Sequence, residues 1–578
     1  MIDAMARRGP DDSGLYVDPG IALGHRRLAV IDVSPAGHQP MTRAGGRIVI
    51  VYNGEIYNFA ELRRDLEARG HRFESRTDTE VIMALYEEYG VECLSRLRGM
   101  FAFALWDRRA AEPRLLLARD HYGIKPLVYA ETGDRLLFAS DLAGLLASGH
   151  VEDAVDSVAR VQYLMHGHVV QPRTWFKGIR MLPPGHRLVV TPGAPIRPER
   201  YWGLEPARCE ALSAGMDFET QAAQVRSLLE AATAAQMVSD VPLGAFLSGG
   251  VDSTALVALM GRAAGRPIHT FSVGFPETDP DLDESPDAER SAAALGAVHR
   301  AVPVSGRELA DRLPAIAVDL GQPSVDGVNI HLVSGAARPS VTVALSGLGG
   351  DEFFAGYSTF EGLAGLASPL RRLRLALGRS VRRVGRARTP LTRAWDRRAA
   401  SRRFAATYLS YRMVRSPEAA WRLAGSPAID PEELFAHLDV DADPGAGVVQ
   451  RVTRLESSLF MTSQLLRDAD AASMAHSLEV RVPLLDVDLT EFAFGLPAAS
   501  HLGAPDPTAG FTGKRVFVRA LRGLIPEWTW RKPKRGFTLP FGTWLRGPMR
   551  GLADDVIGSS AAGGFDAALG RAEWNAYR

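Results

Sequence analysis

The sequence has little cysteine and no net charge. Its two cysteines, Cys93 and Cys209, cannot make the disulfide framework of a secreted domain, and nothing beside them has metal-cluster spacing. The 67 basic and 67 acidic residues cancel, which argues against nucleic acid as the main partner. No apolar run approaches the roughly 20 residues of a membrane span, and residues 1–12 lack the apolar core of a signal peptide. We therefore expect a cytoplasmic protein without a membrane or nucleic-acid partner.

Lysine is also scarce. Five of the 67 basic residues are lysines, and three of these, Lys514, Lys532 and Lys534, fall within 21 residues of one another. Where either cation would serve, this chain uses arginine, so a lysine marks a place where a compact ammonium charge is wanted. The length of 578 residues exceeds what a single core supports, so we expect two or more domains.

The most informative stretch is Val241–Met260, VPLGAFLSGGVDSTALVALM. An apolar run ends at Leu247, Gly249 and Gly250 allow a tight turn, and a helical pattern follows, which predicts a strand, a phosphate-binding loop and a helix. Asp252 would repel phosphate directly but suits Mg²⁺, which bridges phosphate oxygens. The alternative is a plain strand-to-helix turn that needs small residues.

A second stretch of this kind is 341–357, VTVALSGLGGDEFFAGY. Residues 217 to about 550 alternate strand and helix patterns, which predicts an open parallel sheet with its ligand at the carboxyl ends of the strands. Asp351 is then placed to be a second Mg²⁺ ligand beside Asp252.

These motifs resemble the ATP pyrophosphatases, and residues 471–486 (AASMAHSLEVRVPLLD) match a signature of the asparagine synthetase family closely. Within that signature, Glu479 and Arg481 either shape the acceptor pocket or form a buried pair. Lys514 resembles the family lysine that neutralises departing pyrophosphate, with a surface cation as the alternative. The resemblance implies ATP contacts at Leu247, Ser248, Gly249, Gly250, Asp252, Ser253, Val273, Ser346 and Gly347.

One position departs from this family. True asparagine synthetases carry an acid where this chain has Leu348, and that acid is thought to assist formation of the aspartyl-adenylate. Leucine can be neither acid, base nor ligand, so the departure puts the aspartate substrate in doubt but not adenylation. The segment 322–329, QPSVDGVN, also resembles a branch of the family whose acceptors are often unknown.

Residues 1 to about 200 have a β-rich pattern, with strands expected at 47–52, 100–106 and 114–118 and helices at 61–69 and 81–89. Seven motifs resemble, in order, the glutaminase domain of asparagine synthetases, a class II amidotransferase with the N-terminal-nucleophile αββα sandwich. They are RGPDDSG (8–14), GHRRLAVID (24–32), YNGEIYN (52–58), RTDTEV (76–81), GMFAFALWD (99–107), ARDHYGIKPL (118–127) and FASD (138–141).

This resemblance implies a glutamine site. Arg27 and Asp78 would hold the carboxylate and amine of glutamine, Asn53 and Gly54 would form the oxyanion hole, and Glu55 would support the ligand. Taken singly, each of these residues also has an interpretation without a ligand. Arg27 could be a surface cation, Asn53-Gly54 a plain turn, and Asp78 an acid in the first turn of a helix.

The family nucleophile is an N-terminal cysteine whose own α-amine acts as base. This chain has none near its start, and Arg8 stands where the family usually has histidine. In the family, this cysteine would lie about two dozen residues upstream of the first motif, at the head of the first strand. Without that strand, sheet edges and an apolar face of the domain would be uncovered. We expect that the true start lies upstream; the alternative is a truncated, ammonia-dependent enzyme.

The expected organisation is a glutaminase domain over 1–203, a linker over 204–216, an ATP-pyrophosphatase domain over 217–553 and a frayed tail over 554–578. The arginine-rich segment 371–403 is interpreted as a solvated helical insertion, with a docking face for a polyanion as the sharper alternative.

The expected function is glutamine-dependent amidation of a carboxylate through an acyl-adenylate, with ATP and Mg²⁺, most simply asparagine synthesis. A different acceptor, such as a carboxylated sugar or natural-product acid, and a non-catalytic scaffold are the alternatives. A homodimer is one expected assembly.

Overall fold

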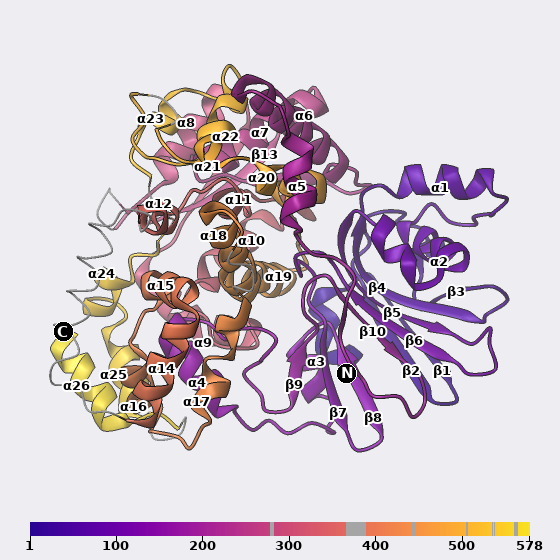
Figure 1. Ribbon diagram of the computed structural model, residues 1–578, viewed down its shortest axis with the longest axis horizontal. Coiled ribbons are helices and arrows are strands. Elements are labelled where there is room, and N and C mark those ends of the chain that lie inside the picture. The colour runs from indigo at the N-terminus through magenta and orange to yellow at the C-terminus, as the bar shows by residue number, and fades with distance from the viewer. Residues whose placement is uncertain are drawn as a thin grey trace.

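The computed structural model describes residues 1–277, 282–365, 389–440, 445–504, 507–534, 536, 538–559 and 564–577. A β-rich first part lies beside a larger, helix-rich second part (Figure 1). No helix in these ranges is both long enough and apolar enough to cross a bilayer.

The first part is a sandwich of antiparallel sheets between helices. One sheet has six strands in the order β11-β10-β6-β5-β4-β3, and β8-β7-β9 and β1-β2 form the facing layer. The strands are β1 (Asp12–Asp18), β2 (Ile21–Arg27), β3 (Met41–Arg43), β4 (Ile48–Ile56), β5 (Gly99–Asp107), β6 (Arg114–Arg119), β7 (Val128–Thr132), β8 (Arg135–Ala139), β9 (Ile179–Met181), β10 (His186–Val190) and β11 (Glu199–Arg200).

Alternation along β4 explains the layers. Ile48 and Ile50 face the helices α1 (Phe59–Ala68) and α2 (Asp78–Tyr89), whereas Val49 and Val51 face the second layer. Beyond that layer, η1 (Ile2–Arg8) and α3 (Leu142–Leu146) cover β7 and β9. The helix–sheet–sheet–helix order confirms the αββα fold class.

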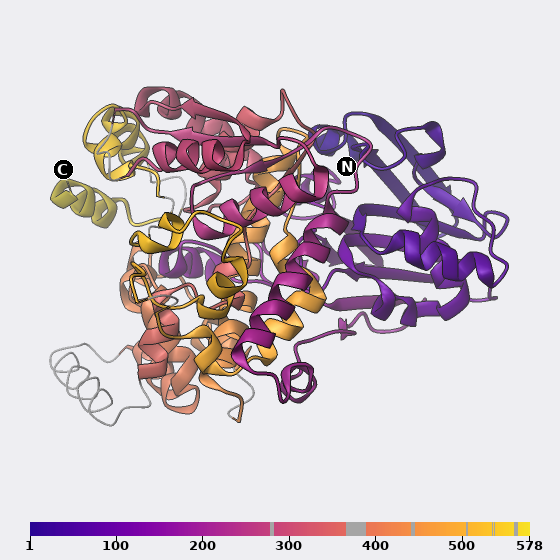
Figure 2. The same ribbon diagram turned by 90° about the horizontal axis from the view of Figure 1, so that it is seen from above.

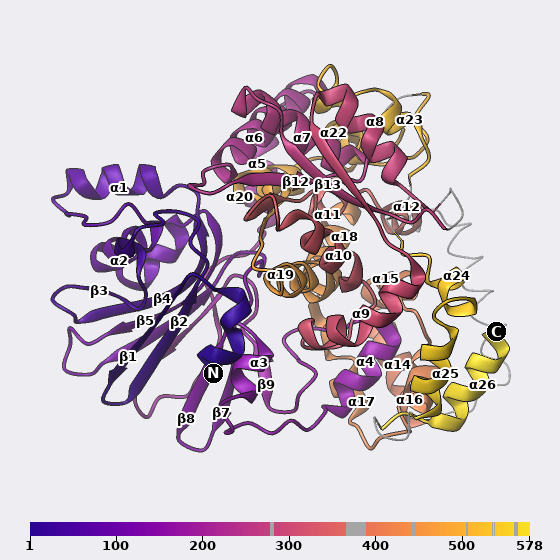
Figure 3. The same cartoon turned by 180° about the vertical axis from the view of Figure 1, so that it is seen from behind.

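The second part is built on a parallel sheet of order β14-β13-β12-β15-β16, as predicted. Its strands are β12 (Leu243–Phe246), β13 (His269–Gly274), β14 (Val298–Pro303), β15 (Val343–Leu345) and β16 (Glu479–Arg481). Figure 3 shows β12 and β13 side by side; α7 packs on β12, and α6 packs on α7.

Helices surround this sheet. They are α4 (Ser157–His166), α5 (Pro206–Ser213), α6 (Phe218–Gln236), α7 (Val251–Ala264), α8 (Ser285–Leu295), α9 (Gly306–Asp319), α10 (Gly327–Ala337), α11 (Gly350–Phe353), α12 (Ser358–Ala364), α14 (Pro390–Ser401), α15 (Arg403–Arg412), α16 (Pro417–Leu423), α17 (Pro431–Leu434), η5 (Ala436–Val440), α18 (Val448–Leu455), the π-helix η6 (Glu456–Leu466), α19 (Arg467–Met474), α20 (Val487–Gly495), α21 (Ala498–His501), α22 (Arg515–Leu521), α23 (Trp528–Arg531), α24 (Phe541–Arg546), α25 (Arg550–Gly558) and α26 (Ala567–Tyr577).

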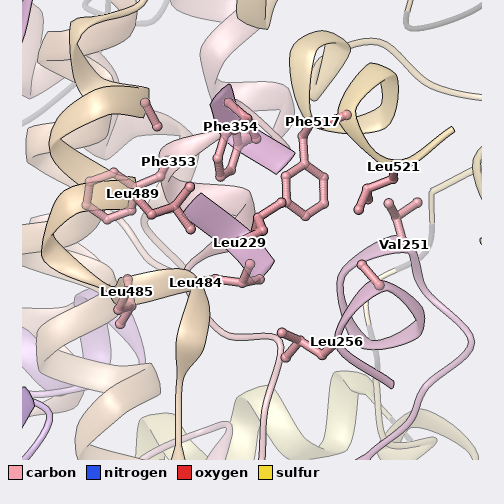
Figure 4. Close-up of a cluster of buried hydrophobic side chains, with 14 of the residues drawn as sticks. Leu229, Val251, Leu256, Phe353, Phe354, Leu484, Leu485, Leu489, Phe517 and Leu521 are labelled. Carbon is pink, nitrogen blue, oxygen red and sulfur yellow. The ribbon is translucent and has the colours of Figure 1, made fainter. Parts of the chain in front are cut away.

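One hydrophobic cluster joins helices that are far apart in the chain. Leu229 of α6 and Val251 of α7 pack with Phe353 and Phe354 at the end of α11 and with Phe517 of α22 (Figure 4). This packing fixes the loop before α7 and the start of α22 relative to each other, and both carry residues of the candidate site.

Three expectations need correction. Asn53 and Gly54 do not form a turn, because both lie within β4 and pair with Ala102 and Phe101 of β5. Residues 204–216 hold the helix α5, which packs on α20. Residues 567–577 are not frayed but form α26, whose Trp574 is buried and donates to Asp554 Oδ1 at 2.6 Å. The domain boundaries themselves stay predictions.

The arginine-rich segment is described only from residue 389 onward; residues 371–388 lie outside the described part of the chain. In α14, Arg398 pairs with Glu432 at 2.9 Å and with Asp439 at 2.8 Å, and Arg397 and the adjoining Arg402 pair with the same acids. Neighbouring acids therefore balance these arginines, as a solvated insertion would require.

The two parts contact each other along an interface seen from above in Figure 2. Arg8 pairs with Asp470 of α19 at 2.7 Å, and Arg98 pairs with Asp486 at 2.8 Å. Tyr122 donates to Thr490 of α20 at 2.7 Å. Arg8, which stands where the resemblance has histidine, is thus a docking residue between the two parts.

Candidate active site

Two loops meet at the carboxyl edge of the parallel sheet. β12 and β15 are neighbours, so the loop 247–250 after β12 and the loop 346–349 after β15 lie together, as the pattern predicted. Gly249 has φ of +72°, and a Cβ there would lie 2.6 Å from the carbonyl carbon of Asp287, so this turn requires glycine. Hydroxyls of Ser248 and Ser253 lie 3.1 Å apart and close the loop.

Lys514 connects the two loops. Its Nζ lies 2.5 Å from Asp252 Oδ2 and 2.6 Å from Asp351 Oδ1, and its side chain is buried. Burial alone would lower the pKa of Lys514, but the two carboxylates outweigh burial and raise it. The alternative of a surface cation is therefore wrong.

A second lysine reaches the same acid. Lys534 Nζ lies 2.5 Å from Asp351 Oδ1. Burial opposes ionisation of Asp351, yet Lys514 and Lys534 together lower its pKa below the usual value. Lys532 pairs with Asp287, beside Gly249, at 2.6 Å. Sequence reasoning did not assign sites to Lys532 and Lys534, although lysine scarcity was the signal that could have identified them.

Most of the residues predicted to bind ATP line one cavity of about 990 Å³. Those lining it are Leu247, Ser248, Gly250, Asp252, Ser253, Val273, Ser346, Gly347, Leu348, Asp351 and Lys514. Gly249 is not among the lining residues and shapes the loop from behind. Glu479 and Arg481 do not line this cavity either, so they do not shape an acceptor pocket there.

A separate small cavity of about 100 Å³ lies where the first part meets Met474 and Glu479 of the second part. It contains every residue predicted for glutamine: Arg27, Asn53, Gly54, Glu55 and Asp78. A Cβ on Gly54, whose φ is +149°, would lie 2.0 Å from Met100 O, so only glycine fits. Asn53 Nδ2 and Glu55 Oε2 are buried without hydrogen-bond partners in this fully described region. These atoms are available to a ligand.

Asp78 and Arg27 are already anchored. Asp78 Oδ2 accepts from Tyr52 Oη and from Ile56 N, both at 2.8 Å, and burial raises its pKa to about 6. The Arg27 guanidinium donates to three backbone carbonyls, among them Asp32 O at 2.6 Å. Arg27 is therefore a buried, oriented cation and not a loose surface residue.

Both halves of the chain match known protein families. The family model described as "Glutamine amidotransferase domain" matches residues 1–202, and the one described as "Asparagine synthase" matches residues 224–578. "Asparagine synthetase [glutamine-hydrolyzing] 1" of Bacillus subtilis is 30% identical over 97% of this chain and 86% of its own. "Putative asparagine synthetase [glutamine-hydrolyzing]" of Mycobacterium bovis is 35% identical over the same shares. "Amidase chyE" of Penicillium rubens is 28% identical over 100% of this chain and 88% of its own.

The chain belongs to the asparagine synthase family. It is therefore an asparagine synthase-type carbon–nitrogen ligase that uses ATP, with a glutamine amidotransferase domain.

The amidotransferase half of this asparagine synthase relative contains a large apolar groove of about 1390 Å³. The edges of β2 and β8 flank it, and Val51, Ala104 and Leu115 of the six-stranded sheet form its floor. β2 pairs only with β1 and β8 only with β7 in this part of the chain, all of which is described. Uncovered sheet edges and an uncovered apolar face were expected here from the motifs.

The two cysteines of this family member are unsuited to attack glutamine. Both are buried, and burial raises the pKa of Cys93 to about 12 and that of Cys209 to about 11. Neither lines the small cavity. A thiol with so high a pKa is inert at neutral pH.

The donor set of the synthetase half fits Mg²⁺. Asp252 and Asp351 converge from two loops, and Asp252 Oδ1 is buried without a hydrogen-bond partner. The described residues hold no cluster of three or more His, Cys, Asp or Glu that could bind a metal unaided. Mg²⁺ commonly uses one or two carboxylates and completes its shell with phosphate oxygens and water, which suits this arrangement.

Proposed function

We propose that the protein amidates a carboxylic acid in two steps at the 990 Å³ cavity. A carboxylate oxygen attacks the α-phosphate of ATP, which forms an acyl-adenylate and releases pyrophosphate. Ammonia then attacks the acyl carbon and displaces AMP, losing a proton as the amide forms. The observation that carries this proposal is Lys514, held between Asp252 and Asp351 at 2.5 and 2.6 Å on the cavity wall.

Each predicted residue has a role in this scheme. Ser248, Ser253 and the backbone N–H groups at the start of α7 bind the phosphates. Val273 and Leu247 bind the nucleotide at the strand ends, with Ser346 and Gly347 opposite. Lys514 neutralises charge that develops on the departing pyrophosphate. Asp252 and Asp351 would hold Mg²⁺, which supplies positive charge to the phosphate oxygens when bound.

We further propose glutamine as the nitrogen source, with Arg27 and Asp78 binding its carboxylate and amine. Asn53 Nδ2, unpartnered and buried, and the backbone of Gly54 would stabilise the oxyanion, and Glu55 would support the ligand. Family chemistry uses an N-terminal cysteine. Free ammonia is the alternative source, because neither Cys93 nor Cys209 reaches the small cavity.

Aspartate is the proposed acceptor, which would make the enzyme part of asparagine biosynthesis. Similarity over 97% of this chain and 86% of the B. subtilis and M. bovis proteins named above supports it. A different carboxylate, from a cell-surface sugar or a natural product, is favoured by one observation: Leu348 lines the cavity where the family has an acid. We propose a cytoplasmic location, and a homodimer is an assembly to be tested.

The test is acid-dependent release of AMP. The purified protein is supplied with Mg²⁺-ATP, ammonium or glutamine, and either aspartate or another carboxylic acid. Release of AMP in the presence of aspartate supports asparagine synthesis. Release of AMP only in the presence of another acid supports a sugar or natural-product acid as the acceptor. If a folded protein binds ATP but no acid gives AMP or pyrophosphate exchange, the protein is a non-catalytic binding protein and the proposal fails.

A further inference from the structure

One part of the wall of the synthetase cavity is formed by the start of α10 and by the junction of η6 and α19. Asp326, Asn329, Gln464 and Asp468 line it there. Asp326 occupies the N-cap position of α10, yet its side chain makes no capping hydrogen bond. Its Oδ1 instead accepts from Asn329 Nδ2 at 3.2 Å. A carboxylate usually caps a helix at this position, so a side chain held on the cavity wall instead is free to serve a ligand.

Cations elsewhere in the cavity are already paired. Arg412 donates to the buried Glu456 through Nε at 3.2 Å and Nη2 at 2.6 Å. Lys532 pairs with Asp287, and Lys514 and Lys534 are held by the nucleotide-loop acids. Each cation therefore has its own acid before any substrate arrives.

Asp326 has no such counter-ion. Within the described residues, no lysine or arginine lies within ion-pair distance of its carboxylate, and the neighbouring acid, Asp468, is paired with Arg467. Ser324 joins the two acids, donating to Asp468 and accepting from Asp326 N at 3.3 Å. One negative charge thus faces the cavity uncompensated, and such a charge is costly unless a ligand compensates it.

We propose that Asp326 binds an ammonium group of the acceptor, so that the substrates of this enzyme are carboxylic acids that also carry an amine. This inference rests on the proposed function, because the same cavity must also hold ATP and the reacting carboxylate. Asn329 orients the Asp326 carboxylate, and Leu348, which lines the same cavity, adds no second charge. Acceptors of this class include aspartate and exclude simple dicarboxylic and sugar acids without an amine.

The experiment uses matched pairs of acids that differ only in an ammonium group, such as aspartate with succinate and 3-aminopropanoate with propanoate. AMP release is measured with the full chain, Mg²⁺-ATP and ammonium chloride, and acid binding is measured by calorimetry beside a non-hydrolysable ATP analogue. The amine-bearing member should bind and react about tenfold better or more, the usual effect of one charge-assisted hydrogen bond.

Asp326→Asn should bring that ratio close to one without changing the affinity for the ATP analogue. Asp326→Ser tests the same point should the first variant fold poorly. Glu361→Gln, at an exposed acid on the same cavity, is the matched control and should keep the preference. An unchanged ratio in the Asp326 variants, or equal binding and turnover of both members of each pair, would overturn the inference. Failure to bind ATP, or no AMP from any acid despite ATP binding, would instead remove the proposed function itself.

Discussion

Arg481 Nη2 lies 3.7 Å from Glu55 Oε1, although the two residues are 426 positions apart and belong to different halves of the molecule. Arg481 is fully buried, and its Nε donates to Glu479 Oε1 at 2.8 Å. Its backbone O accepts from Ser346 N at 2.8 Å. One residue therefore contacts both the predicted glutamine site and a nucleotide loop. The interpretation of Glu479 and Arg481 as a buried pair is confirmed.

Removing this cation should destabilise the interface. Arg481→Met leaves Glu479 buried without its counter-charge, and breaking a buried pair costs about 3–5 kcal/mol. Burial and the charges of Asp78 and Glu479 already raise the pKa of Glu55 well above its usual value, so the neutral Glu55→Gln should cost far less. Urea unfolding measures the free energy of unfolding of both variants. Arg64→Met, on the exposed face of α1, is the control. Equal losses in the Arg481 and Glu55 variants would contradict this account.

Two glycine substitutions should have opposite effects. Gly54→Ala places a Cβ 2.0 Å from Met100 O and should break the pairing of β4 with β5, destabilising the fold by more than about 2 kcal/mol. Gly261 lies within α7 with open space where a Cβ would stand, so Gly261→Ala should stabilise it by about 0.5–1 kcal/mol. The unfolding temperatures of the two variants, compared with that of the unchanged protein, measure these effects. Stabilisation by Gly54→Ala, or loss of stability in Gly261→Ala, would refute these packing assignments.

Lys514 should be needed for chemistry in a variant that still folds. Lys514→Met removes the charge that stabilises leaving pyrophosphate, and loss of one such group typically lowers kcat about 10²–10³-fold. Lys177→Met, at an exposed lysine of the first part, should have wild-type activity. Circular dichroism checks folding, and AMP release gives the rate. A Lys514 variant with near-normal kcat would exclude this role.

The affinity for amine-bearing acids should depend on pH. Burial, reinforced by the charge of Asp468, raises the pKa of Asp326 to about 6. Below that pH the carboxyl is protonated and neutral, so it cannot pair with an ammonium group; above it the carboxylate binds. KM for aspartate should therefore fall about tenfold between pH 5 and 7, and the Asp326→Asn profile should be flat. A KM that rises over this interval would show that another group dominates.

Local patterns predicted the elements that carry the loops. The apolar runs before Ser248 and Ser346 became adjacent parallel strands, because a buried parallel strand needs a continuous apolar sequence. Thr77 caps α2 by accepting from Glu80 N, a contact between residues only three positions apart. The type of each element, strand or helix, depends mainly on neighbours in sequence, whereas the adjacency of the two strands depends on the fold.

Features that depend on distant segments could not be predicted in this way. Lys534 reaches Asp351 across 183 positions, and the approach of Arg481 to Glu55 requires the two halves to dock. Asn53-Gly54 has the local signature of a turn, but pairing with β5 keeps the chain extended. Asp326 occupies a capping position, and only the cavity explains why its side chain does not cap.

The central claim is that an acceptor carboxylate attacks the α-phosphate of ATP. Aspartate labelled with ¹⁸O in its carboxylates, incubated with the protein, Mg²⁺-ATP and ammonium, tests this directly by mass spectrometry of the nucleotide. One ¹⁸O atom should be transferred to AMP, with unlabelled pyrophosphate, because the carboxylate oxygen stays on the α-phosphorus when ammonia displaces AMP. Label in inorganic phosphate with ADP as the nucleotide product, or unlabelled AMP alongside the amide, would contradict it.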